Sequence, residues 1–185
     1  MTFETAVAVD TIWTIGHSTR SLDAFLALLH EYRIGAIADV RRFPGSRRYP
    51  HFARDALAAT LSAQGIAYRW LPKLGGRRRA EADSPNTGWR NAAFRGYADY
   101  LSSTAFEEGL HDLLALAANH RTAIMCAEAV WWRCHRSLIA DVLRFRGIEV
   151  IHIVDAGHST VHTYTSPARI VDGRLTYAAP AGDLL

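Results

Sequence analysis

Lysine is nearly missing from this sequence, in which Lys73 is the single lysine among 185 residues. Cysteine is also scarce, with two residues that could form one disulfide at most. No apolar run approaches the roughly 20 residues needed to cross a bilayer. The first ten residues contain two acidic residues and no basic segment, so they do not resemble a signal peptide. We therefore expect a cytoplasmic protein with reduced thiols and no membrane association.

Basic charge is concentrated in one part of the chain. Residues 33–95 contain thirteen basic and four acidic residues, a net charge of +9, whereas the remainder carries a net charge of −6. Arginine forks bind phosphate and carboxylate well. An arginine-rich proteome would explain the lack of lysine, but it would not explain the clustering. We expect an anionic partner for this region, either a small molecule or a single-stranded nucleic acid.

The order of apolar segments predicts a single α/β domain over residues 1–185. Buried strands are expected at 11–16, 35–40, 66–71, 122–126 and 148–154, and helices at 21–33, 54–65, 94–120 and 134–147. The segment 94–120 is expected as one helix or as two with a break near 102–103. Asp172-Gly173 separates two alternating runs, which predicts a hairpin within residues 160–180. The fold class is therefore α/β, with three layers, a mostly parallel sheet of about five strands, a core over 11–154 and a C-terminal β-hairpin.

Most of the reactive side chains follow the expected carboxyl ends of the strands. The segments that leave these ends are 16–19, 39–50, 71–79 and 126–136. In folds of this class, ligands bind outside the carboxyl ends of the strands, near a switch in strand order. We therefore predict a functional pocket at this edge of the sheet.

The segment "CAEAVWWRCHR" at 126–136 supplies the candidate reactive groups. Cys126 ends a strand ahead of a predicted helix, where helix N–H groups and nearby positive charge would lower its pKa and make it a nucleophile. It could instead be a small apolar residue that closes a buried strand. Glu128 lies where a general acid or base is common, although it could also cap the helix. His135 and Arg136 would tune the site electrostatically.

The same segment permits a metal interpretation, which we do not favour. Cys126, Cys134 and His135 match none of the usual zinc spacings, and a fourth ligand would have to come from elsewhere. Adjacent residues on a helix point about 100° apart, so Cys134 and His135 are not expected to hold one ion. We predict no metal and no other cofactor. A thiol-based redox or metal-sensing protein is an alternative if Cys126 and Cys134 approach each other.

Two other strand ends supply predicted anion-binding groups. The turn at 16–18 presents backbone N–H groups, a hydroxyl and the imidazole of His17. In "DVRRFPGSRRYPHF", a Pro-Gly turn could fold two arginine pairs into a clamp, although a solvated basic loop is the alternative. Asp39 begins this segment, close to where such folds keep a ribose-binding acid. The predicted phosphate- or anion-binding residues are Gly16, Ser18, Arg41, Arg47, Arg48, Arg77 and Arg136.

Aromatic side chains near these ends could stack on a planar ligand. Tyr49 follows the second arginine pair. Trp131 and Trp132 are adjacent and cannot both face the core of one helix, so we expect one of them, Trp131, at the pocket rim. It could instead be a core tryptophan with an exposed neighbour.

The chain resembles the DUF488 family, which has no assigned function. The resemblance rests on "TIGHST", "DVRRFPGSRRYPHF", "YRWLPKLGGR", "FRGYADYL", "CAEAVWWRCHR" and "VIHI", which follow in order from about residue 11 to residue 154. It implies an α/β domain of Rossmann-like type and no particular reaction. The positions that match family motifs are Gly16, His17, Ser18, Asp39, Arg41, Pro44, Ser46, Gly75, Gly76, Phe94, Tyr97, Cys126, Glu128, Cys134, His135 and Arg136.

Two functional hypotheses follow from these residues. The first is an enzyme, a hydrolase or group transferase, that acts on a phosphate-bearing substrate such as a nucleotide or a nucleic-acid component. Redox chemistry is less favoured, because no dinucleotide fingerprint is present. The second is a non-catalytic nucleic-acid-binding module, in which aromatic residues within the basic stretch would stack on bases. The catalytic candidates of the first hypothesis are Cys126, Glu128, His135, Asp39 and His17.

Overall fold

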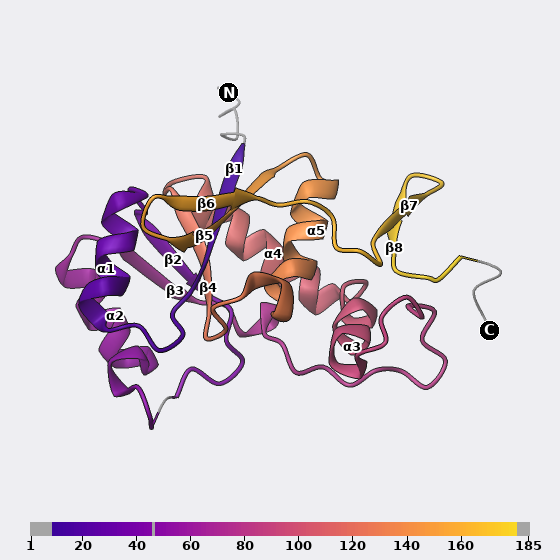
Figure 1. Ribbon diagram of the computed structural model, residues 1–185, viewed down its shortest axis with the longest axis horizontal. Helices are drawn as coiled ribbons and strands as arrows, with labels where there is room; N and C mark the ends of the chain where they lie inside the picture. Colours follow the sequence, from indigo (N-terminus) through magenta and orange to yellow (C-terminus); the bar gives the residue numbers. More distant parts are fainter. Residues whose placement is uncertain (1–8, 46, 181–185) are drawn as a thin grey trace, which may run out of the picture.

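Strands and helices alternate along most of the chain in a computed structural model, which describes residues 9–45 and 47–180 (Figure 1). Residues 1–8 and the motif position Ser46 lie outside the described residues. The strands are β1 (Thr11–Gly16), β2 (Ala36–Asp39), β3 (Ala67–Trp70), β4 (Thr122–Cys126), β5 (Glu149–Asp155), β6 (His158–Val161), β7 (Arg169–Val171) and β8 (Arg174–Thr176). The helices are α1 (Leu22–Glu31), α2 (Arg54–Ala63), α3 (Ala92–Tyr100), α4 (Thr104–Ala117) and α5 (Arg136–Phe145), with short 3-10 helices η1 (Pro50–Phe52), η2 (Pro72–Leu74) and η3 (Trp131–Arg133).

The main sheet has the strand order β3-β2-β4-β1-β5-β6. Strands β1 to β5 run parallel to their neighbours, and β6 pairs antiparallel with β5. The predicted α/β class with a mostly parallel sheet is therefore confirmed. Strand β6 adds to the expected strands, because Gly157, with a φ of 64°, reverses the chain and lets residues 158–161 pair with β5.

The C-terminal hairpin is also confirmed. Strands β7 and β8 pair with each other and lie apart from the main sheet, beside α5 (Figure 1). Asp172 and Gly173 have φ values of 49° and 71°. Positive φ at both central residues is the geometry that a two-residue Asp-Gly turn favours.

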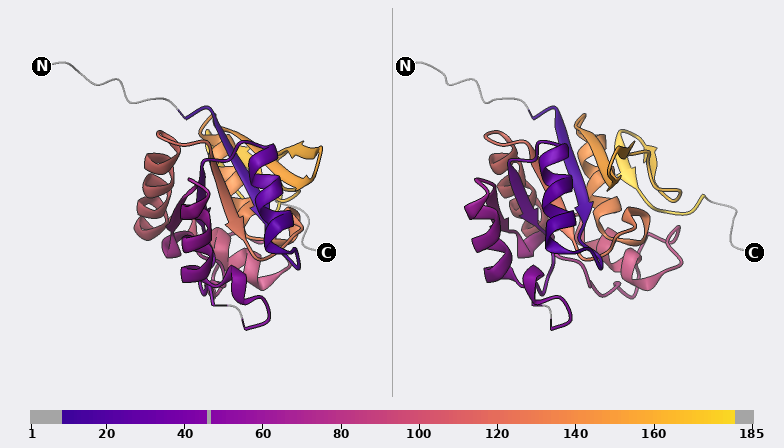
Figure 2. Two further views of the ribbon diagram at one scale, coloured as in Figure 1. Left: turned by 90° about the vertical axis from the view of Figure 1, so that its left-hand side faces the viewer. Right: turned by 60° about the vertical axis from the view of Figure 1, so that its left-hand side comes forward.

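Helices cover both faces of the sheet, because side chains alternate along each strand. On one face, α1 and α2 pack through Phe25, Leu29 and Leu57 against Ile15 and Ile37. The opposite face carries α3, α4 and α5, whose apolar side chains pack around the strand residues Ile12 and Ile124. Figure 2 shows α1 and α4 on opposite sides of the strands. The three-layer arrangement follows from strands that are buried on both faces.

The helical segment at 94–120 is divided into α3 and α4. The Ser103 hydroxyl accepts a hydrogen bond from the Phe106 N–H at 3.1 Å and thereby caps α4. Asn91 caps α3 in the same way, so this helix begins two residues before the expected position. The longest helix in the described ranges, α4, has 14 residues, and none of those helices is long and apolar enough to cross a bilayer.

The long segment between β3 and α3 is fastened to α3. The hydroxyl of Tyr97 donates to the Leu74 carbonyl at 2.7 Å, and the hydroxyl of Tyr100 donates to the Lys73 carbonyl at 2.7 Å. Farther along, the Asp99 carboxylate accepts hydrogen bonds from Ser84 and from the backbone N–H of Glu81. This segment is therefore held in one conformation along much of its length.

The carboxyl ends of β1 and β4 form the switch point of the sheet. These strands are neighbours, with Gly16 paired to Cys126. After β1 the chain passes β4 to reach β2, toward one edge of the sheet. After β4 it passes β1 to reach β5, toward the opposite edge. Diverging connections leave a crevice above the strand ends, where ligands bind in folds of this class.

A buried carboxylate joins α5 to the C-terminal part of the chain. Asp141 is fully buried and accepts hydrogen bonds from Thr165, through both its hydroxyl and its N–H, and from the Tyr177 hydroxyl. Its remaining partner is His162, at 2.9 Å. A buried carboxylate needs such partners, because an unpaired charge in the interior is strongly destabilising.

We predict that Tyr177→Phe destabilises the fold, because it removes one of these hydrogen bonds. A hydrogen bond to a charged group contributes about 1.5–3 kcal/mol, and urea unfolding should show a loss in this range. Tyr164→Phe is the control, since this half-buried ring packs beside Arg144 rather than on Asp141. Equal stability of Tyr177→Phe and the wild type would contradict the role of this contact.

Candidate functional site

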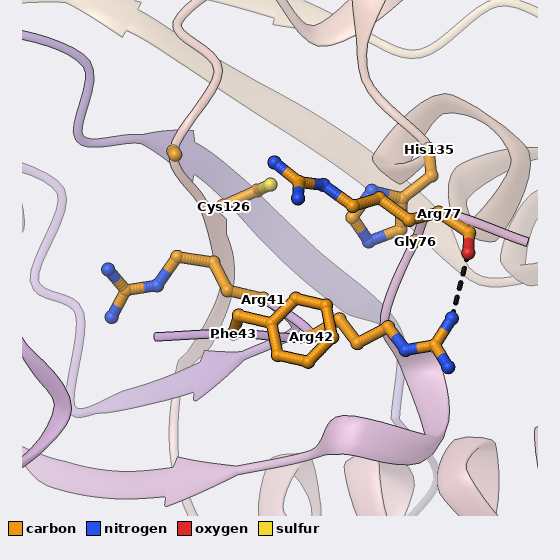
Figure 3. A pocket seen from close by; sticks show the side chains of 8 residues that line it. Arg41, Arg42, Phe43, Gly76, Arg77, Cys126 and His135 are labelled. Atoms are coloured by element: carbon orange, nitrogen blue, oxygen red, sulfur yellow. Dashed lines mark hydrogen bonds between the residues drawn. The ribbon is translucent and has the colours of Figure 1, made fainter. Parts of the chain in front are cut away.

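A cleft lies above the carboxyl ends of β1, β2 and β4. It consists of three adjoining hollows of about 170, 340 and 310 Å³, all of which are lined in part by Ala127. Figure 3 shows the first hollow from close by. The residues that line the cleft include the predicted site residues His17, Ser18, Arg41, Arg48, Tyr49, Arg77, Cys126, Glu128 and His135.

The loop after β4 is held against the end of β1. The N–H groups of His17 and Ser18 donate to the carbonyls of Cys126 and Ala127, at 3.0 and 2.9 Å. These N–H groups are therefore occupied, and they do not point into the cleft as a phosphate cradle would require. A Cβ on Gly16 would lie 2.7 Å from the Glu128 carbonyl carbon and 2.8 Å from the Ala129 Cα. Gly16 is thus a site of close backbone approach rather than a ligand-binding group.

Arg136 holds the same loop in place from the interior of the protein. This buried guanidinium donates to the Glu128 carbonyl at 2.5 Å and to the Thr14 hydroxyl at 3.3 Å. Its Nε donates to the Cys134 sulfur at 3.4 Å. Arg136 therefore organises the site from the interior, and its position is different from that of a surface anion-binding arginine.

Asp39 and Arg41 form a buried ion pair. The guanidinium of Arg41 donates to both carboxylate oxygens of Asp39, with a shortest distance of 2.6 Å, and Tyr68 donates to the same carboxylate at 2.6 Å. Arg41 also donates to the Phe52 carbonyl at 2.8 Å. These contacts make Asp39 a group that positions Arg41 at the wall of the cleft.

His17 is a neutral part of this wall. Its ring stacks on Phe52 at 4.2 Å, its Nε2 lies 3.3 Å from Arg41, and its Nδ1 lies 3.0 Å from the Ser18 carbonyl. Since a carbonyl can only accept, Nδ1 carries the proton and Nε2 accepts from Arg41. Burial, together with the positive charge of Arg41, lowers the pKa of His17 to about 4.

Cys126 and Cys134 meet at the floor of the cleft. The two sulfurs and a ring nitrogen of His135 lie within 4.8 Å of one another. Cys126 is half-buried and lines two of the hollows, whereas Cys134 is 4% exposed. The condition for a thiol-based alternative, that both cysteines approach each other, is therefore met.

The two thiols have opposite acidities. The hydrogen bond with Cys134, burial and the charge of Cys134 raise the pKa of Cys126 well above its usual range. Burial opposes the ionisation of Cys134, but the hydrogen bond from Cys126 and the charges of His135 and Arg136 outweigh it and lower the pKa of Cys134 well below its usual range. The expected lowering of the Cys126 pKa is therefore wrong, because α5 begins only at Arg136 and Cys134 is the cysteine beside it.

Cys134 and His135 point toward each other, whereas two adjacent residues on a helix would point about 100° apart. Cys134 instead has an extended backbone, with φ −125° and ψ 146°, and the helix starts after His135. The Cys134 sulfur consequently lies 3.6 Å from Nδ1 of His135.

The basic side chains around this floor come from three loops, which follow β2, β3 and β4. Arg42 and Arg77 are exposed and line the first hollow, and Arg42 donates to the Arg77 carbonyl at 2.8 Å. In Figure 3 the Arg77 side chain extends across the hollow toward Cys126, whereas the Arg41 guanidinium points away. Arg48 lines the second hollow, and Arg133 lines the third. Arg47 is exposed on the loop that precedes η1.

The aromatic residues are distributed differently from the prediction. Trp131 is half-buried and stacks on His152 at 4.1 Å, so that face of its ring is covered, and Trp132 is 58% exposed. Phe43, which is 66% exposed and lines two hollows, was missed as a stacking residue. Its neighbour Arg42 belongs to one of the two arginine pairs of the expected clamp but was not named among the predicted anion-binding residues. Their place soon after the end of a strand was the available signal. Phe52, one of the aromatic residues within the basic stretch, is fully buried and is therefore not accessible to a base.

We predict that Gly16→Ala disturbs the loop after β4. The added methyl group meets backbone atoms that can move only if the loop moves, which costs on the order of 1–3 kcal/mol. Urea unfolding would show this loss, and the thiols should react faster with a thiol reagent. Gly45→Ala is the control, because its methyl group would meet no atom within 4 Å. The same behaviour in both variants would contradict the role of Gly16.

We predict that His17 makes the fold sensitive to acid. Its folded-state pKa of about 4 lies below its usual value of 6.5, so the unfolded chain binds the proton more tightly. The stability that neutral His17 contributes is complete above pH 6.5 and is lost as the pH falls toward 4, by at most roughly 1.4 kcal/mol per pH unit. His17→Gln should therefore show a shallower loss of unfolding free energy between pH 6.5 and 4.5 than the wild type. Parallel pH profiles would refute this prediction.

The comparisons with known proteins agree with the sequence motifs. The model of the family described as "Domain of unknown function DUF488" matches residues 21–143 of the 185. This range runs from the N-cap of α1 into α5 and contains Asp39, Cys126 and His135. Neither the curated proteins nor the solved structures gave a significant match. The family match covers well over half of the chain, and the chain therefore belongs to the DUF488 family.

Proposed function

We propose that this protein is an enzyme, a hydrolase or group transferase, that acts on a phosphate-bearing substrate such as a nucleotide or a nucleic-acid component. One observation carries the proposal. Exposed arginines and an accessible thiol line the same hollow, which lies above the carboxyl ends of β2, β3 and β4 and adjoins the switch point of the sheet. Anion recognition and a candidate reacting centre are therefore combined where this class of fold binds its ligands.

Arg77 and Arg42 are the proposed phosphate-binding groups. Arg77 has a left-handed backbone, with φ 58°, and its side chain extends over the hollow (Figure 3). The hydrogen bond from Arg42 to the Arg77 carbonyl holds the two loops together where both line the first hollow. Planar guanidinium groups can bind phosphate oxygens in pairs, and Arg48 extends the positive charge into the second hollow.

Phe43 and Tyr49 are the proposed stacking groups for a planar part of the substrate. Phe43 lines two adjoining hollows, and Tyr49 lines the second. A base that lay on Phe43 would place its phosphate within the arginine-lined part of the cleft. Stacking on an aromatic ring tolerates any base, so this contact would contribute affinity rather than base selectivity.

The reaction is assigned to the floor of the cleft. Cys126 or Glu128 would perform the nucleophilic or acid–base step, since both line the hollow that also contains His135 and Arg133. Asp39 and His17 act indirectly in this proposal, because their polar atoms hold Arg41 in place. Arg136 positions the loop that carries Cys126 and Glu128.

We predict that Arg77→Gln weakens the binding of a labelled mononucleotide. The lost charged hydrogen bonds correspond to about a 10- to 100-fold increase in Kd. Arg33→Gln is a matched control, because Arg33 is also exposed and also has a left-handed backbone, with φ 52°, but lies beyond the C-terminal end of α1, just ahead of the amino end of β2. Equal affinities of the wild type and Arg77→Gln would overturn the assignment of the anion site.

The same titration should be repeated with a single-stranded oligonucleotide across a salt series. A nucleic-acid-binding module would lose oligonucleotide affinity steeply with salt, because many phosphate contacts release counterions. It would also show little binding of mononucleotides. That pair of results would favour the module over the enzyme.

A further inference from the structure

We infer that Cys126, Cys134 and His135 form a zinc site whose fourth coordination position opens into the cleft. Metal binding by these residues does not depend on which substrate enters, so this inference goes beyond the proposed function. It rests on the convergence of two sulfurs and one imidazole nitrogen within 4.8 Å at the carboxyl ends of the strands. Sulfur and imidazole ligands in this number are typical of zinc.

The spacing of the ligand atoms fits a tetrahedral ion. Zinc lies about 2.3 Å from a cysteine sulfur and about 2.0–2.1 Å from a histidine nitrogen, which places the two ligand atoms roughly 3.6 Å apart at a tetrahedral angle. The Cys134 sulfur lies 3.6 Å from Nδ1 of His135. The two atoms are therefore already at the separation that a shared ion requires.

The imidazole presents the correct nitrogen. Nε2 of His135 lies 3.2 Å from the Val40 carbonyl, which can only accept, so this nitrogen carries the proton. A metal displaces the other ring proton, so the lone pair that His135 offers to an ion is on Nδ1, the atom that faces Cys134. Ligating histidines usually donate their second ring nitrogen in this manner, which fixes the orientation of the ring.

Backbone packing keeps this ring in position. A Cβ on Gly76 would lie 2.8 Å from Nδ1 of His135, so the glycine permits the loop to pack against the imidazole. Tyr97 packs on the ring from another side, at a centroid distance of 5.0 Å. Gly76 and Tyr97 both match family motifs that had no assigned role.

The Cys134 sulfur has a donor that stabilises a thiolate. Nε of Arg136 donates to this sulfur at 3.4 Å. Two thiolates neutralise the charge of one zinc ion, and N–H···S bonds of this kind orient ligands around a metal. The buried guanidinium therefore assists the site rather than excluding a cation.

Three protein ligands with an open position are typical of catalytic zinc. Cys126 and His135 line two of the hollows, and Glu128 lines one of them beside Cys134. This step rests on the proposed function: a zinc-bound water would give one proton to Glu128, and the hydroxide would form a bond to the electrophilic atom of the substrate. The bond to the leaving group would break, and the leaving group would take the proton from Glu128.

The test begins with the metal alone. Protein prepared under reducing conditions would be loaded with zinc or with cobalt(II) and dialysed. The number of metal ions per chain would then be measured by elemental mass spectrometry. We expect one ion per chain, and for cobalt a thiolate charge-transfer absorption with the strong visible bands of tetrahedral coordination. Zinc should also raise the melting temperature, because it binds the folded state preferentially.

Ligand variants locate the ion. Cys134→Ser and His135→Ala should weaken metal binding by more than the roughly 10- to 100-fold that the loss of an outer hydrogen-bond partner costs. His111→Ala is the control, since this exposed histidine lies on α4. If Cys134→Ser fails to fold, Cys126→Ser answers the same question at the half-buried ligand. Full cobalt spectra in all three ligand variants would overturn the site.

Two other results would also overturn it. The first is wild-type protein that retains no metal and gives no cobalt spectrum. The second is a Cys126–Cys134 disulfide in protein purified without a reductant that persists when zinc is present, which would indicate a thiol-based redox pair. Mononucleotide binding by metal-free protein, with and without Arg77→Gln, tests the anion site separately, so failure of one proposal is distinguishable from failure of the other.

Discussion

The candidate site depends on one buried cation, the guanidinium of Arg136. Its donors reach the Glu128 carbonyl, the Thr14 hydroxyl and the Cys134 sulfur, so the helix α5, the strand β1 and the loop after β4 are joined at one group. A buried guanidinium is strongly destabilising unless such partners are present, which makes the loop conformation and the position of Arg136 mutually dependent. From Thr14 the hydrogen bonds continue through two buried histidines to Asp141, and the loop is thereby coupled to the core.

The strand order determines where this organised loop can act. Gly16 and Cys126 are paired neighbours at the ends of strands whose connections leave in opposite directions. The crevice above these strand ends is open to a ligand. Its floor is closely packed backbone, because Gly16 lies in close contact with the loop after β4. A rigid floor with more exposed loops above it is a suitable arrangement for holding reactive groups in place while substrates enter.

Positive charge is used in two different ways around the cleft. Arg41 and Arg136 are buried and fully engaged, and they shape the walls and floor. Arg42 and Arg77 are exposed and face the hollow. Burial of Arg41 together with Asp39 removes one charge of each sign from the surface and leaves the net charge of the arginine-rich stretch unchanged, and the exposed pair lies where an anion would need it. The thiols and His135 lie below this pair, so anion binding and the proposed metal chemistry occupy adjoining parts of one cleft.

Alternation of apolar segments and turn residues was sufficient to determine the fold class of this protein. The bounds of β1 and β4 and the Asp172-Gly173 hairpin follow from local sequence, because buried strands and tight turns have strong local preferences. The placement of reactive residues at one sheet edge follows as well, since parallel strands end on the same side. Only the tertiary structure decided which of these residues are accessible and which are paired with one another. Cys134 and His135 face each other because the helix starts one residue after them, and Asp39 is hidden because Arg41 and Tyr68 fold over it. Such contacts join residues distant in sequence, or depend on where a helix begins, and local patterns specify neither.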